Sequence, residues 1–258
     1  MYRNPFDGAR AKIERSHKHF KELLEAEAVL SKPQTLKIDV EPQSNGDTKV
    51  FGTVEHLPKL AEGAIVADIL GNLRSSIDIA AHQACIARGQ ADKKKLDASV
   101  FPFGGSEKDW EGNLPRRCPA ADETLIRTIR AFKPWKEDGN ALLYALSKIA
   151  AKDKHVDLVP LANRPDCLEI SGISTSNPEI GVTGYQGCVP VWIRDKAELF
   201  TILAPAKVEV TGPCILRAKF GFGETYALAC EPVIPTLNQM GAMCEQIIDA
   251  LEAASKLP

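Results

Sequence analysis

The sequence has no strong charge excess, no long apolar run and few aromatic residues. Its 32 Lys and Arg residues nearly balance its 34 Asp and Glu residues, so no global basic field favours nucleic acid or an anionic membrane. No segment approaches the roughly 18 to 20 apolar residues that a bilayer crossing needs, and the first twenty residues lack the apolar core of a signal peptide. We therefore expect a cytoplasmic protein with no membrane partner.

The sequence also lacks the usual motifs of metal and nucleotide sites. Its seven cysteines are odd in number, widely spaced and without a Cys-x-x-Cys pair, which argues against a disulfide framework or a zinc cluster. We expect most of them to be buried free thiols. The five histidines show no metal-binding spacing, and neither a dinucleotide-binding glycine motif nor a phosphate-binding loop occurs. The sequence thus predicts no metal site and no cofactor.

The first three-fifths of the chain shows mainly helical periodicity. Apolar residues at helical spacing predict helices over residues 7–31, 63–88, 122–132 and 140–156, and the lysine-rich stretch 91–99 is expected to be a polar loop. Alternating residues on either side of an Asn-Gly turn predict a β-hairpin at about 35–56. Residues 1–161 are therefore predicted to form a helical core with an inserted hairpin.

The remaining residues, 162–258, have a different pattern. Short β-like runs are separated by Gly and Pro at spacings near ten residues, which is typical of a small antiparallel sheet or half-barrel. An amphipathic helix over residues 236–255 ends the chain. The fold class is predicted to be α+β, with a helical core, a β-rich C-terminal half and a closing amphipathic helix. The two halves are either separate domains or parts of one.

Polar residues interrupt the apolar helix in the stretch DILGNLRSSIDIAAH, from Asp68 to His82. At 100° per residue, Val66, Leu70, Leu73, Ile77 and Ala84 form the predicted core stripe. Arg74 lies at the border of this stripe, Asp78 and His82 follow it one and two turns later, and Asn72 lies away from it. A buried cation needs a partner, which Asp78 or, from the helix over 140–156, Asp153 could provide. We expect an Arg74–Asp153 pair, with Asp78 or Asn72 completing the hydrogen bonds.

Two hypotheses explain this polar set. In the first, the Arg–Asp pair is a brace that fixes the register of two helices. In the second, it is part of an active site, because Lys154 and His155 follow Asp153 directly. His155 or His82 would act as general acid or base, Arg74 would stabilise a charged phosphorane, and Asn72 and Lys154 would bind the substrate.

Four elements of the sequence, ADILGNLRSSID, FPF, FKPW and DKHVDL, resemble a widespread, uncharacterised bacterial protein family. That family has a Gly-Asp-x-x-His-Asn-Leu-Arg-Ser-x-Leu-Asp-His block, a Phe-Pro-Ile element, a Gln-Pro-Tyr-like element and an Asp-Lys-His-Arg block, in this order. The matching positions are Asp68, Asn72, Leu73, Arg74, Ser75, Asp78, Phe101, Pro102, Pro134, Asp153, Lys154 and His155. The chain differs at Gly71 and Ile79, where the family has His, and at Val156, where it has Arg.

The family block also resembles HEPN-type helical ribonucleases, in which an Arg and a His are separated by four to six residues. Ile79 stands at that His position here. We therefore expect a non-catalytic binding or assembly module, whose partner the sequence does not name. The alternative is a HEPN-like, metal-independent endoribonuclease that acts on RNA as a homodimer. A third hypothesis is a small-molecule binder that uses the β-rich half.

Overall fold

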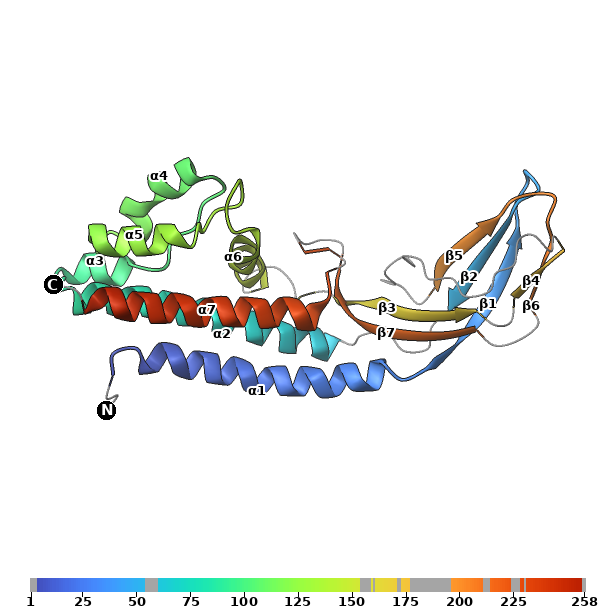
Figure 1. The fold of residues 1–258 in the computed structure, drawn as a ribbon, viewed down its shortest axis with the longest axis horizontal. Helices are drawn as coiled ribbons and strands as arrows, with labels where there is room; N and C mark the ends of the chain where they lie inside the picture. The colour runs from blue at the N-terminus through green and yellow to red at the C-terminus, as the bar shows by residue number, and fades with distance from the viewer. Residues whose placement is uncertain are drawn as a thin grey trace. The chain divides into compact units, whose positions relative to one another are not determined.

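The computed structural model describes residues 4–53, 60–153, 159, 161–170, 173–176, 196–210, 214–223, 228, 229 and 231–256. The chain divides into two compact units, each assembled from separate segments (Figure 1). The helical unit comprises Met1–Glu22, Ala64–Val159 and Ile234–Pro258, and the sheet unit comprises Leu23–Gly63 and Pro160–Val233. Helices and antiparallel strands are both well represented, so the predicted α+β class is confirmed.

The helices largely follow the predicted apolar periodicity. They are α1 (Asp7–Leu30), α2 (Leu60–Ala87), α3 (Lys93–Ala98), α4 (Glu107–Arg117), α5 (Glu123–Ala131), α6 (Ala141–Asp153) and α7 (Val233–Ser255). In the helical unit α1, α2 and α7 run side by side (Figure 1). The five residues of the predicted α2 core stripe are each at most 1% exposed. None of the described helices has both the length and the apolar composition needed to cross a bilayer.

The predicted polar loop at 91–99 is wrong, because residues Lys93–Ala98 form α3. Asp92 caps this helix by accepting a hydrogen bond from the Lys95 amide at 3.2 Å. A capped helix as short as α3 does not show in the apolar pattern, because none of its residues is buried. The sequence also did not reveal α4, whose cap is Ser106 and whose buried anchor is Trp110.

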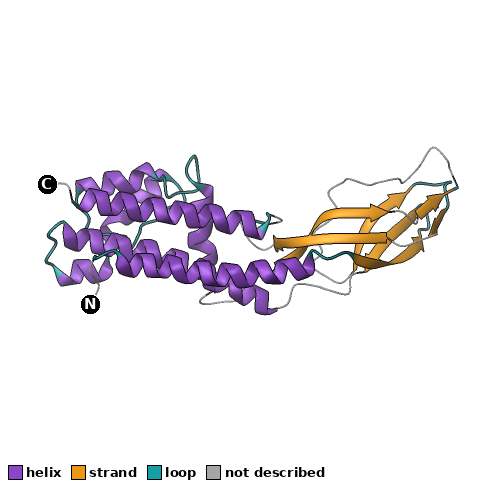
Figure 2. Ribbon diagram, turned by 60° about the horizontal axis from the view of Figure 1, so that its bottom comes forward, coloured by secondary structure: helices purple, strands orange, loops and turns teal. Residues whose placement is uncertain are grey.

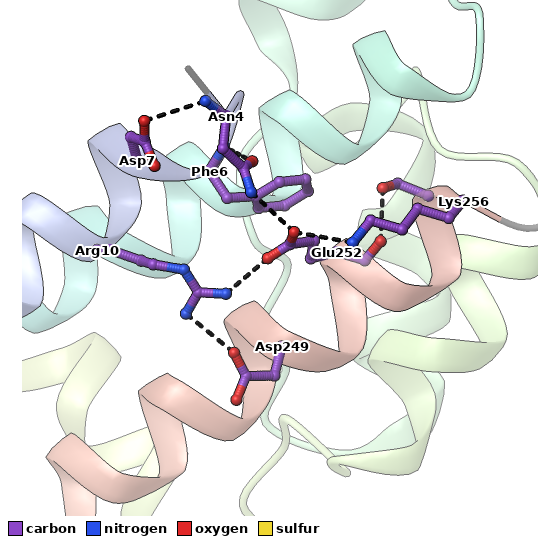
Figure 3. A network of polar contacts seen from close by, with 8 residues as sticks. Asn4, Phe6, Asp7, Arg10, Asp249, Glu252 and Lys256 are labelled. Carbon is purple, nitrogen blue, oxygen red and sulfur yellow. Dashed lines mark hydrogen bonds and ion pairs between the residues drawn. The ribbon is translucent and has the colours of Figure 1, made fainter. Parts of the chain in front are cut away.

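The start of α1 is held to the last turns of α7 (Figure 3). The Asn4 side chain accepts a hydrogen bond from the Phe6 amide, and the Asp7 carboxylate accepts one from the Asn4 amide. This reciprocal pair of hydrogen bonds resembles a capping box and lies in the turn just before α1. The Glu252 carboxylate of α7 accepts hydrogen bonds from Asn4, Arg10 and Lys256. Hydrogen bonds from Asn4 and then Lys256 are the main reason that the pKa of Glu252 is lowered to about 2.

The sheet unit combines the hairpin with strands from the C-terminal half (Figure 1), and its strands are drawn in orange in Figure 2. The strands are β1 (Gln34–Pro42), β2 (Thr48–Thr53), β3 (Leu161–Ile170), β4 (Ile173–Thr175), β5 (Lys196–Ile202), β6 (Val208–Val210) and β7 (Cys214–Phe222). The five-stranded sheet has the order β3-β7-β1-β2-β5, and β4 pairs with β6. The predicted hairpin thus forms, with Gly46 at φ 90° in its turn. Its strands lie between strands that are distant in sequence.

The two faces of this sheet carry different side chains. Leu36, Val50 and Leu199 are buried, and Gly52 leaves room between Leu36 and Leu199, whose methyl groups would lie 3.1 to 3.3 Å from an added Cβ. The residues between these buried positions point to the opposite face of the sheet, where charged side chains pair across neighbouring strands. Lys196 lies 2.8 Å from Glu41 and 3.4 Å from Asp39, and Lys49 lies 2.7 Å from Glu198.

Candidate functional site: a polar clamp on helix α2

Arg74 and Asp78 form an ion pair one turn apart on α2. Arg74 Nη2 lies 3.0 Å from Asp78 Oδ1, and the two side chains are only 17% and 25% exposed. The spacing of four residues places both side chains on the same side of the helix. Because both are largely shielded from water, the pair is worth more than an exposed pair, provided that the remaining hydrogen-bonding groups are satisfied.

Both side chains bind the same residue of the segment before α4. Arg74 Nη2 donates a hydrogen bond to the Phe101 carbonyl oxygen at 3.2 Å, and the Phe101 amide donates one to Asp78 Oδ1 at 3.0 Å. The Arg74 guanidinium also lies over the Phe103 ring, 4.1 Å from its centroid. We call the set Arg74, Asp78, Phe101 and Phe103 the Phe101 clamp. It joins α2 to an irregular segment through the two main-chain groups of one residue.

The electrostatics of the clamp reflect its burial. Desolvation lowers the pKa of the Arg74 guanidinium from its usual value, and the charge and hydrogen bond of Asp78 oppose this effect. The nearby charge of Arg117 lowers the same pKa further. An arginine nevertheless stays protonated in proteins, so the clamp holds a permanent cation. Nη1 of this guanidinium is buried and has no hydrogen-bond partner among the described residues.

The clamped segment continues into a second contact, with the loop after α5. The Gly104 amide donates a hydrogen bond to the Pro134 carbonyl oxygen at 3.1 Å, and Gly104 and Trp135 form an isolated parallel bridge. The FPF and FKPW elements of the sequence therefore lie side by side. Only glycine fits at position 104, because an added Cβ would lie 2.5 Å from the Trp110 amide nitrogen.

Two tryptophans complete this corner of the helical unit. The rings of Trp110 and Trp135 lie 5.5 Å apart, and Arg130 lies over the Trp110 ring, 5.3 Å from its centroid. Both tryptophans are at most 4% exposed. Sequence reasoning missed this cluster, and the glycines before α4 were the one local sign of a close main-chain approach.

The other predicted site residues with described side chains do not join the clamp. Asn72 donates a hydrogen bond from Nδ2 to the carbonyl oxygen of Asp68 on its own helix, at 2.8 Å. The His82 ring donates from Nδ1 to the Leu96 carbonyl oxygen of α3 at 3.0 Å. Arg74 and Asp78 thus come together, whereas Asn72 and His82 each bind a main-chain carbonyl elsewhere.

The predicted Arg74–Asp153 pair lies outside what the structure describes. Asp153 is the last residue of α6, but its side chain is not among the described groups, and Lys154 and His155 lie outside the described residues. The pair and the catalytic role of His155 therefore stay predictions. The contact that is described comes from Asp78, on the same helix as Arg74.

The cysteines for which the structure describes a thiol are Cys85, Cys118, Cys214 and Cys244. All four are buried thiols that form no disulfide, as expected. Within the described part of the chain, no group of three or more metal-ligating side chains is placed to hold an ion. No family model, curated protein or solved structure matches the chain.

Proposed function

We propose that this protein is a non-catalytic binding or assembly module in which the Phe101 clamp is a structural brace. One observation carries the proposal: both charged groups of the clamp are bound to the amide and the carbonyl oxygen of Phe101. Arg74 Nη2 and Asp78 Oδ1 are thus engaged by main-chain groups in the folded protein, and Arg74 Nη1 is buried. The role of this pair is to fix the segment before α4 against α2.

The contacts of the guanidinium argue against a role in phosphate chemistry. Nη2 is shared by Asp78 and the Phe101 carbonyl oxygen, and the planar group is covered by the Phe103 ring. A phosphate would have to displace Asp78 or the main chain to reach this nitrogen. Displacing either would leave a partly buried charge or amide without its partner, which is costly.

The alternative, a HEPN-like endoribonuclease with RNA as its substrate, requires a histidine within hydrogen-bond reach of the reacting groups. His82 is bonded to the Leu96 carbonyl oxygen, which leaves His155 as the candidate. This alternative and the homodimer that it implies stay predictions, and no described contact favours them over the brace.

An RNA cleavage assay separates the two roles. Full-length protein is incubated with single-stranded and hairpin RNA in the presence of a metal chelator, beside the His155→Ala and Arg74→Lys variants. We expect intact RNA in every sample. Metal-independent cleavage by the wild type that disappears in both variants would overturn the proposal.

A hydrogen-exchange measurement tests the brace directly. Because the Phe101 amide donates to Asp78, we expect it to exchange slowly in the wild type and much faster in Asp78→Ala. The control is Asp109→Ala, at an exposed carboxylate in the first turn of α4 that is not part of the clamp. Equal exchange of the Phe101 amide in all three proteins would contradict the bracing role.

A further inference from the structure

A cavity of about 250 Å³ lies in the helical unit between α1, α2 and α7. Ile69 and Leu73 of α2 line it as buried apolar residues, together with Leu237 of α7. The other lining residues come from α1 and α7: Ser16, His17, Phe20, Asn238, Gly241, Ala242 and Glu245. The cavity therefore combines an apolar floor with polar groups, the usual composition of a small-molecule site.

Part of this cavity is left open because position 241 has no side chain. Gly241 is a buried residue in the interior of α7, and an added Cβ would meet no atom within 4 Å. Close packing therefore does not require a glycine at this position. Alanine would fit and would favour the helix more than glycine does. A bound ligand beside Gly241 would account for a glycine at this place.

The charge of the lining favours a cation. The lining residues include no Lys or Arg, and Glu245 is the acidic residue among them. His17 Nε2 lies 3.7 Å from Glu245 Oε1, and both side chains are about half exposed, at 59% and 48%. The Phe20 ring adds a surface that attracts ammonium groups.

We infer that this cavity binds a small organic ammonium compound. Its ammonium group pairs with Glu245, and its short apolar chain lies against Ile69, Leu73 and Leu237. The cavity and the Phe101 clamp have no residue in common. The inference therefore does not rest on the proposed function, and either can fail without the other.

Calorimetric titration of the full chain with three probes of equal chain length tests the inference. These are n-hexylammonium, hexan-1-ol and hexanoate at neutral pH. We expect n-hexylammonium to bind most tightly, hexan-1-ol more weakly and hexanoate not at all. Failure of n-hexylammonium to bind the wild type, or equal binding of the ammonium and the alcohol, would overturn the assignment.

Two pairs of variants locate the site. Glu245→Gln should weaken binding of n-hexylammonium by about tenfold and leave hexan-1-ol unchanged, whereas Glu14→Gln, at an exposed position of α1 outside the cavity, should change neither. Gly241→Leu should abolish binding by filling the space. Its control is Gly112→Leu in α4, where an added Cβ also meets nothing within 4 Å.

Circular dichroism checks that each variant is folded. Should Gly241→Leu fail to fold, Gly241→Ala replaces it and should reduce the affinity for n-hexylammonium relative to n-butylammonium, because it shortens the space. Unchanged binding in a folded Gly241→Leu, an unchanged ratio in Gly241→Ala, or the same loss in Glu14→Gln as in Glu245→Gln would refute the site.

Discussion

The helical unit and the sheet unit use ion pairs in different ways. In the helical unit Arg74 and Asp78 are mostly shielded from water and bind a main-chain residue. In the sheet unit Lys49 and Glu198 form a similarly short contact, but their side chains are 37% and 39% exposed. The distance between the charged atoms, 3.0 Å in the first pair and 2.7 Å in the second, therefore does not by itself decide how much each pair stabilises the protein.

The difference lies in what surrounds each pair. Water and salt screen an exposed pair, so its contribution to stability is small. A largely buried pair interacts more strongly, but each member depends on the other because an unpaired buried charge is costly. We therefore expect the helical unit to be sensitive to the loss of single charges and the sheet unit to be sensitive mainly to packing.

The largest expected effect is in the clamp. Arg74→Ala removes the cation that pairs with the partly buried Asp78 carboxylate, and should lower the free energy of unfolding by about 3 kcal/mol. Denaturation followed by tryptophan fluorescence measures this change. Arg116→Ala, which removes an exposed arginine that donates a hydrogen bond to Asn113, should have little effect. A similar loss in both variants would remove the contrast between buried and exposed charges.

A packing change should dominate in the sheet unit. The added methyl group of Gly52→Ala would crowd the buried residues Leu36 and Leu199, at a cost of about 1 to 2 kcal/mol. Gly71→Ala in α2, where the Cβ meets nothing within 4 Å, should instead stabilise the protein by about 0.5 to 1 kcal/mol. Hydrogen exchange of the β1 and β2 amides measures the change in stability for Gly52→Ala, and exchange of the α2 amides measures it for Gly71→Ala. Stabilisation by Gly52→Ala would show that the two leucines have room to move.

The Glu252 network should make stability depend on acid pH. Because the pKa of Glu252 is lowered to about 2 in the folded protein from about 4.3 in an unfolded chain, its contribution is complete above the unfolded value. It is lost as the pH falls from about 4.3 towards 2, and is on the order of 1 kcal/mol after solvent screening. The measurement is the unfolding free energy against pH for the wild type and Glu252→Gln. Parallel curves for the two proteins would contradict this expectation.

The smallest effect is expected for the exposed pair on the sheet. Lys49→Met should change the stability by less than about 0.5 kcal/mol, and 1 M NaCl should remove most of that difference. Exchange of the β2 and β5 amides, with and without salt, measures it. A loss comparable to that of Arg74→Ala would mean that exposure does not decide the value of these pairs.

The local features of this fold follow from the sequence. The apolar stripe of α2, the Asn45-Gly46 hairpin turn and the closing helix are each encoded within one segment, through residue spacing and turn preference. The same spacing places Asp78 one turn from Arg74. Such features could be predicted because both partners lie within a few residues of each other.

Only the tertiary structure decided the rest. Three features each depend on segments that are far apart in the chain. They are the pairing of the hairpin with β7 and β5, the binding of Arg74 and Asp78 to Phe101, and the space beside Gly241. The main-chain groups of Phe101 are the same as those of almost any other residue, so no sequence pattern marks them as partners. The sequence determined that a cation on α2 needed to be neutralised, and the folding of distant segments determined which groups surround it.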